Sequence, residues 1–176
     1  MRSERMADGD TAGTVLRRLV AEAVGVEETD RGALAADLAE RGDDPGPAAR
    51  LSALVGPGDS LVGVVPRVDP ALARRLLGNA DGRSGGTIRL AFTGQAANRL
   101  TSASGTLVQP ILAEYGVDAY RHDGDSPIGV LLVDDRAVVG LFDEGGLAAL
   151  LWSDAPEVRE WAAETCRRYL SAADPV

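Results

Sequence analysis

The chain has 176 residues, of which 45% are hydrophobic, so it has the length and apolar content of one globular domain with a short appendage. Lys and Arg together number 18 against 27 Asp and Glu, and the formal net charge of −9 excludes a generally basic nucleic-acid-binding protein. No stretch approaches the roughly 18 apolar residues of a membrane span, and the polar start lacks the apolar core of a signal peptide. We therefore expect a cytoplasmic protein.

The first third of the chain is predicted to be helical. Residues 1–12 are polar, and we expect them to be disordered. In residues 14–25, apolar side chains recur at helical spacing, with Thr14 as a candidate N-cap and Gly25 at the end. This pattern predicts the first helix.

Two further short helices are predicted before the pattern changes. One begins at Asp30 and places Leu34 and Leu38 on one face. The other covers residues 48–55 and follows the run DDPGP, whose composition is typical of a loop. With the first helix, they make residues 13–58 a helical N-terminal segment.

The middle of the chain alternates between strands and helices. Residues 61–66 form a continuous apolar run that predicts a strand buried on both faces, and residues 69–77 predict a helix capped by Asp69. Residues 87–93 and 117–122 predict two more strands. Because helical crossovers connect these three strands, they should lie parallel.

The last part of the chain predicts a hairpin and a closing helix. Two apolar strands over residues 127–133 and 137–142 are separated by Asp-Asp-Arg, a composition typical of a tight turn. Residues 146–152 predict one more strand. The closing helix runs from a cap at Asp154 to about residue 172.

These elements predict the α/β class, with one domain over residues 59–173. The sheet should be mixed but mainly parallel, extended by the C-terminal antiparallel hairpin and covered by helices on both faces. Ligands bind such sheets at the carboxyl ends of the parallel strands. The residues predicted to bind a ligand there are Arg67, Thr93, Gln95 and His122, with Pro66 on the same rim.

Two segments of this predicted site could instead be ordinary loops without a ligand. The backbone N–H groups of Thr93-Gly94-Gln95 could hold an anion at a helix start, or the segment could be an ordinary loop between strand and helix. The run from His122 to Asp125 could face a ligand or a metal, or could be a polar loop before the hairpin. We expect no metal site and no cofactor.

Several other polar or aromatic groups are predicted to be structural. Asp134-Asp135 and residues 143–146 have turn compositions. Trp161, Tyr169 and Cys166 share one face of the closing helix, which favours a role in the core or at a subunit interface.

The missing residue types exclude several chemistries. All 18 basic residues are Arg, so no Schiff-base lysine, P-loop lysine or lysine general base exists. Cys166 is the only cysteine, which excludes an intrachain disulfide and a cysteine-based zinc cluster. The acidic excess is typical of proteins from a salty cytoplasm, and the codon bias of a GC-rich genome is the alternative explanation.

Three stretches carry a resemblance to a known family: DDPGPAARLSALVGPGDSLVGVVPRVDPALARRLL, GTIRLAFTG and SPIGVLLVDDRAVVGLFDEGGLAALLWSDAPEVREWAAETCRRY. Over residues 43–172 the chain resembles the effector domain, of the FilR-type middle-domain family, of winged-helix transcriptional regulators from archaea, abundant in haloarchaea. The resemblance implies a phospholipase-D-like fold used for sensing, as in TrmB-type regulators. It also implies dimers and a winged helix N-terminal to this domain.

The chain departs from that plan in two ways. The residues before the matched region are too few for a winged helix, so we expect this part to be missing, degenerate or lost through a misplaced start. The phospholipase D reaction needs an H-x-K-x4-D motif, which a chain without Lys lacks. We therefore expect no enzymatic activity.

Three functions follow as hypotheses. The leading one is a non-enzymatic regulatory module that binds a small metabolite or dimerises, as a homodimer or with a related winged-helix regulator. The second is a DNA-binding regulator with a divergent helix-turn-helix within residues 13–58. The third is a metal-dependent hydrolase built on Asp123 and Asp125.

Overall fold

An eight-stranded sheet is the centre of the computed structural model, which describes residues 11–25, 35–80, 86–101, 105–126 and 128–176. The strands are β1 (Asp37–Glu40), β2 (Leu61–Val65), β3 (Ile88–Phe92), β4 (Val117–Arg121), β5 (Ile128–Val133), β6 (Arg136–Asp143), β7 (Gly146–Ser153) and β8 (Asp174–Pro175). The helices are α2 (Ala12–Val24), α3 (Pro47–Leu54), α4 (Pro70–Ala80), α5 (Gly94–Thr101), α6 (Gly105–Glu114) and α7 (Pro156–Ser171).

The sheet is mixed, as the sequence predicts. Its strands lie in the order β1-β7-β6-β5-β2-β3-β4-β8. Strands β2, β3 and β4 are parallel, which confirms the expectation for the three strands joined by helical crossovers. The hairpin β5–β6 extends the sheet antiparallel from β2. The expectation of a mainly parallel sheet is wrong, because among the described strands only the pairs β2–β3 and β3–β4 are parallel, and β1, β7 and β8 also pair antiparallel.

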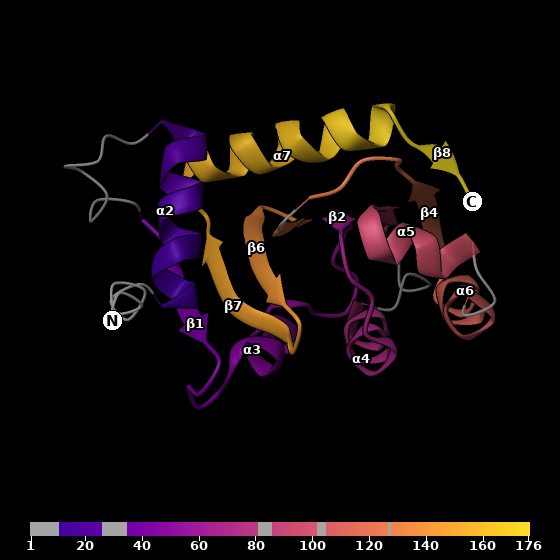
Figure 1. Cartoon of the computed structure of the whole chain (residues 1–176), viewed down its shortest axis with the longest axis horizontal. Helices are drawn as coiled ribbons and strands as arrows, with labels where there is room; N and C mark the ends of the chain where they lie inside the picture. Colours follow the sequence, from indigo (N-terminus) through magenta and orange to yellow (C-terminus); the bar gives the residue numbers. More distant parts are fainter. Residues whose placement is uncertain (1–10, 26–34, 81–85, 102–104, 127) are drawn as a thin grey trace, which may run out of the picture.

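Helices cover both faces of the sheet (Figure 1). Helices α2 and α7 supply buried apolar side chains to one face, and α3, α4, α5 and α6 supply them to the other. Each face therefore has its own hydrophobic core, and the α/β class with helices on both faces is confirmed. None of the described helices has the length and apolar composition needed to cross a membrane.

The prediction of a helix around Leu38 is wrong. Residues 37–40 form β1, which pairs antiparallel with β7, so that Leu38 lies opposite Leu151. The Ala- and Leu-rich composition favours a helix, but pairing with the free edge of β7 outweighs that propensity. Asp30 and Leu34 lie outside the described residues. The segment 13–58 therefore contributes a strand to the sheet and is not purely helical.

The helix-turn-helix alternative does not fit the described part of this segment. In a helix-turn-helix, two consecutive helices pack against each other. Here α2 packs on one face of the sheet and α3 on the other, with β1 between them in the chain. The prediction of disorder for residues 1–12 falls mostly on residues outside the description, although Thr11 is the N-cap of α2.

Two predicted helix caps are shifted by a few residues. Helix α2 is capped by Thr11, whose Oγ1 accepts a hydrogen bond from the amide of Thr14, so the predicted cap is itself inside the helix. Helix α7 has Ala155 at its N-cap, and Ser153 Oγ accepts from the Ala155 amide. Asp154 is exposed and does not cap α7 as predicted.

Cys166 belongs to the core under α7. Its side chain is 1% exposed, and its Sγ lies 3.6 Å from the carbonyl oxygen of Val62 and 3.8 Å from that of Val130. Burial raises the pKa of the thiol from 9.0 to about 12. This placement supports the prediction that Cys166 is a small buried hydrophobic residue.

The raised pKa of Cys166 predicts a loss of stability at high pH. Below pH 9 the thiol is protonated in both states, and its contribution is fully present. Between pH 9 and 12 the unfolded thiol ionises while the folded thiol does not, so the free energy of unfolding should fall by roughly 1 kcal/mol per pH unit. Denaturant unfolding of the wild type and of Cys166→Ala across this range measures the difference. Parallel pH dependences of the two proteins would contradict the prediction.

Candidate functional site

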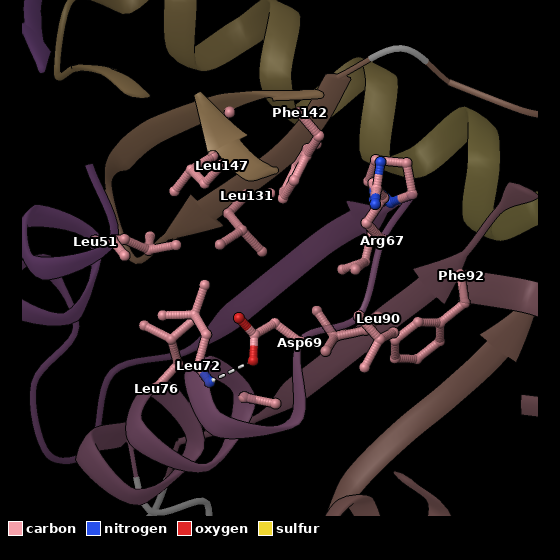
Figure 2. A pocket seen from close by; sticks show the side chains of 18 of the residues that line it. Leu51, Arg67, Asp69, Leu72, Leu76, Leu90, Phe92, Leu131, Phe142 and Leu147 are labelled. Atoms are coloured by element: carbon pink, nitrogen blue, oxygen red, sulfur yellow. Dashed lines mark hydrogen bonds between the residues drawn. The ribbon is translucent and has the colours of Figure 1, made fainter. Parts of the chain in front are cut away.

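An apolar cavity of about 540 Å³ lies on the face of the sheet that α3, α4 and α6 cover (Figure 2). Strands β2, β3, β5, β6 and β7 line its other side. Three of its lining residues carry a charge, namely Arg67, Asp69 and Glu144, and the others are aliphatic, aromatic, proline or glycine. Asp69 and Glu144 are exposed, so the cavity opens to solvent where they lie.

Two glycines contribute to the volume of the cavity because they have no side chains. Gly129 of β5 and Gly140 of β6 are paired across the hairpin and line the cavity. A Cβ atom at Gly129 would lie 3.1 Å from the ring of Phe142, and one at Gly140 would lie 2.9 Å from Leu147 Cδ1. The Phe142 ring therefore lies against a surface without side chains, and larger residues would push Phe142 and Leu147 out of place.

Helix α4 forms the opposite wall. Asp69 Oδ1 accepts hydrogen bonds from the amides of Ala71 at 3.0 Å and Leu72 at 3.3 Å, which confirms the predicted cap. From this start, the helical spacing brings Leu72, Ala73 and Leu76 to the cavity. Figure 2 shows Leu72 and Leu76 facing Leu131 and Leu147 of the sheet.

The mouth of the cavity holds an ion pair and a neighbouring arginine. Arg41 donates to both carboxylate oxygens of Asp143, with N–O distances of 2.9 and 2.8 Å. The hydrogen bond from Arg41 lowers the pKa of Asp143, and the same bond raises the pKa of Arg41. Arg67 Nη1 donates to the backbone oxygen of Asp143 at 2.7 Å. Arg41 is thus the main partner of the Asp143 carboxylate, while Arg67 hydrogen-bonds only to the backbone there and lowers the pKa of Asp143 through space by a smaller amount.

The structure does not bring the predicted ligand-binding residues into one site. Arg67 and its neighbour Pro66 line the cavity, at the carboxyl end of β2. Thr93, Gln95 and His122 do not line it. The reason is that the segments after β3 and β4 bind each other, through a hydrogen bond from the Gly94 amide to the oxygen of Gly124.

The amides at the start of α5 already have partners. The Gly94 amide donates to the oxygen of Gly124 at 3.1 Å, and the Ala96 amide donates to the oxygen of Pro66 at 3.2 Å. Thr93 is fully buried, and Gln95 is exposed. These contacts favour the ordinary loop between strand and helix over an anion site.

The polar groups in the loop after β4 also have hydrogen-bond partners within the loop. His122 Nδ1 accepts from the Gly124 amide at 2.8 Å, and its ring lies 4.7 Å from that of Tyr169. Asp125 Oδ1 accepts from the Ser126 amide. Across the described residues no three His, Cys, Asp or Glu side chains are grouped as a metal site would require.

The turns predicted from composition are present. Asp134 has φ of 50° between β5 and β6, and its Oδ1 accepts from the Ser60 amide at 2.9 Å. Asp143 begins the turn from β6 to β7 and accepts from the Gly145 amide. Neither is part of a carboxylate pair. Trp161 and Tyr169 pack against the core under α7, as expected for core residues.

The apolar lining was missed at the level of the sequence. Leu72, Leu131 and Phe142 have the same pattern as ordinary core residues, and no periodicity separates a packed core from a lined cavity. The available signal was glycine inside two apolar strands, at Gly129 and Gly140, since glycine in a strand often marks a close approach.

The family model for the middle domain of the methanogenesis regulatory protein FilR1 matches residues 46–172. No curated protein sequence matches the chain.

Solved structures show the fold. The chain is similar to Nuc, a phospholipase D family member from Salmonella typhimurium, with 11% identity, a TM-score of 0.63, and 81% of this chain and 97% of that chain covered. It is similar to NucT from Helicobacter pylori, with 13% identity, a TM-score of 0.64, and 80% and 98% covered. These matches confirm the predicted phospholipase-D-like fold.

A third structure is that of TrmBL2, an archaeal chromatin protein described as showing a novel mode of DNA binding. The identity is 13% and the TM-score 0.57, and the match covers 92% of this chain but 65% of TrmBL2. At such low identities these structures show only that the fold is shared. The family model, in contrast, matches most of the sequence. The chain therefore belongs to the FilR1 middle-domain family, a family of transcription-regulator domains.

Proposed function

We propose that this chain is a non-enzymatic effector domain that binds a small, mainly apolar molecule in the cavity between α4 and the sheet. The observation that carries the proposal is the cavity itself. Its volume of about 540 Å³ lies within the range of roughly 300–1,000 Å³ that is usual for small-molecule sites. Protein interiors are otherwise packed to high density, so an apolar space of this size loses packing energy unless it is filled.

The chemistry of the lining supports binding over catalysis. The titratable groups that line the cavity are Arg67, Asp69 and Glu144. Asp69 is engaged in capping α4, and Glu144 is exposed. The cavity thus lacks a paired nucleophile and base, which nucleophilic catalysis requires. The absence of Lys also supports this proposal against the phosphodiesterase chemistry of the fold relatives.

The position of the cavity supports a role in regulation. An occupant would contact α4, the sheet and the turn between β6 and β7 at once. A ligand that binds the folded form in this way stabilises it by an amount that grows with concentration. We propose that this change is passed to a DNA-binding segment or partner, within a homodimer or a heterodimer with a related regulator in the cytoplasm.

A matched pair of variants on α4 tests the proposal. Ala73 lines the cavity, whereas Ala71 lies two residues away and is exposed. Ala73→Trp should fill the cavity with an indole ring and abolish binding, while Ala71→Trp should leave binding intact. The measurement is the fluorescence of N-phenyl-1-naphthylamine, a neutral apolar dye, titrated with each full-length protein.

The wild type and Ala71→Trp should give saturable enhancement at one site, and Ala73→Trp should give none. Circular dichroism and thermal melts of all three proteins establish that each is folded. The proposal is overturned if the wild type gives no saturable signal, or if a folded Ala73→Trp protein binds the dye as the wild type does.

A further inference from the structure

We propose that the natural ligand carries a carboxylate at one end of an apolar body, and that Arg67 binds this carboxylate at the mouth of the cavity. This inference rests on the proposed function and names the chemical class of its ligand. The observation behind it is the state of the charges at the mouth. The guanidinium of Arg67 lines the cavity there, makes one hydrogen bond, to a backbone oxygen, and forms no salt bridge within the described residues.

Arg67 is half-buried, and it forms no ion pair within the described part of the chain. Its one hydrogen bond runs from Nη1 to the backbone oxygen of Asp143, which is a neutral acceptor. A guanidinium has five N–H donors in a planar fork that matches the two oxygens of a carboxylate. The guanidinium donors that make no hydrogen bond within the described residues can bind an anionic ligand, and charge-assisted hydrogen bonds of this kind are stronger than neutral ones.

The nearby carboxylates do not neutralise Arg67. The carboxylate of Asp143 is held by Arg41 through two hydrogen bonds. Asp69 accepts two amide hydrogen bonds at the start of α4, where the positive end of the helix dipole also offsets its charge. Glu144 is exposed and keeps its hydration. An anion at Arg67 therefore displaces no hydrogen-bonded side chain, and Asp143 acts on the guanidinium only through space.

The rest of the cavity determines the body of the ligand. Inward from Arg67 the walls are the leucines of α4 and the apolar side chains of the strands, with Leu51 of α3 on the other side of the cavity in Figure 2. The one carboxylate beside these walls is that of Asp69, which caps α4, so they offer little to a second polar group. A linear or compact hydrocarbon body attached to a single terminal carboxylate is the chemistry that matches both parts.

Three probes with the same ten-carbon tail test this inference: decanoate, 1-decanol and decyltrimethylammonium. Calorimetric titration of the full-length protein at pH 7.5 should show decanoate binding more tightly than decanol, and decyltrimethylammonium binding least. Octanoate should bind more weakly than decanoate by roughly tenfold, because two fewer methylene groups are buried.

Two variants separate the role of Arg67 from general packing. Arg67→Gln keeps a hydrogen-bond donor but loses the charge, so it should weaken decanoate binding by about 10- to 100-fold and leave decanol binding unchanged. Glu144→Gln removes the exposed negative charge at the mouth. It should strengthen decanoate binding a few-fold and weaken decyltrimethylammonium binding.

The outcomes distinguish the two proposals. Equal binding of decanol and decanoate, or an unchanged ratio of the two in Arg67→Gln, overturns the inference about the carboxylate while leaving an apolar site in place. Tightest binding of decyltrimethylammonium overturns it in the opposite direction, in favour of a cationic ligand. Failure of the neutral dye and of all three probes overturns the proposed function itself.

Discussion

Ala162→Asp should prevent the chain from folding. Ala162 lies in the middle of α7, is fully buried, and belongs to the core between α7 and the sheet with Val158 and Cys166. The helix contacts β2, β3, β5 and β6 along its length. A carboxylate there would be buried among apolar side chains, at an expected cost of about 4 kcal/mol or more. Since domains are stable by only about 5–15 kcal/mol, this loss removes a large part of the stability and at the lower end of the range nearly all of it.

The adjacent residue provides the matched control for Ala162→Asp. Ala163 is partly exposed, so Ala163→Asp can keep its charge in contact with water and should cost about 1 kcal/mol or less. Urea unfolding followed by circular dichroism measures both variants against the wild type. A cooperative transition for Ala162→Asp near the wild-type midpoint would mean that α7 is not packed on the sheet as described.

The expected sensitivity of α7 reflects a difference between the two faces of the sheet. Under α2 and α7 the core holds small and branched side chains in close contact, and neither of these helices lines the large cavity. On the opposite face, α4 stands away from the strands far enough to leave the cavity. One face of the sheet is therefore covered by a packed core, and the other contains the cavity of the proposed site. Changes on the first face should alter stability, and changes on the second should alter binding.

Local sequence patterns were enough to predict most of the strands and helices. Residues 61–66 are a continuous apolar run, residues 87–93 alternate between polar and apolar side chains, and the hairpin turn has the composition its geometry needs. The strand at residues 37–40 could not be predicted, because its residues favour a helix and only pairing with β7 makes them extended. The same holds for β8, whose two residues pair with β4 at the end of the chain.

The site was only partly predictable for a related reason. The rule that ligands bind at the carboxyl ends of parallel strands pointed to Arg67, and the structure places this residue at the cavity. The rule also pointed to Thr93 and His122, but the loops that follow β3 and β4 hydrogen-bond to each other through Gly94 and Gly124 and fill that edge. Whether a loop closes over an edge depends on contacts between distant segments, which local patterns do not encode.

Gly63→Val should destabilise the protein although valine is favoured in strands. Gly63 lies opposite Leu131 in the antiparallel pair of β2 and β5. A Cβ atom at Gly63 would lie 2.2 Å from Leu131 Cδ2 and 2.8 Å from the backbone oxygen of Val130. In an open strand position, valine would add up to about 1 kcal/mol of stability. Here the overlap should reverse the sign, with a loss of about 3 kcal/mol in the free energy of unfolding.

The same substitution links the packing of β2 to the cavity, because Leu131 lines it. A valine at position 63 should push the Leu131 side chain away from β2 into the space that a ligand would occupy. Gly63→Val should therefore bind the neutral dye more weakly, even at a temperature where the variant is fully folded.

The double variant Gly63→Val/Leu131→Ala removes the displaced side chain and should regain dye binding and part of the lost stability. The overlap with the Val130 backbone oxygen remains in the double variant, so its stability should stay below that of Leu131→Ala alone. Equal dye affinities for the wild type and a folded Gly63→Val protein would show that Leu131 has room to move elsewhere. Such a result would mean that the glycine is needed for strand packing and has no part in shaping the cavity.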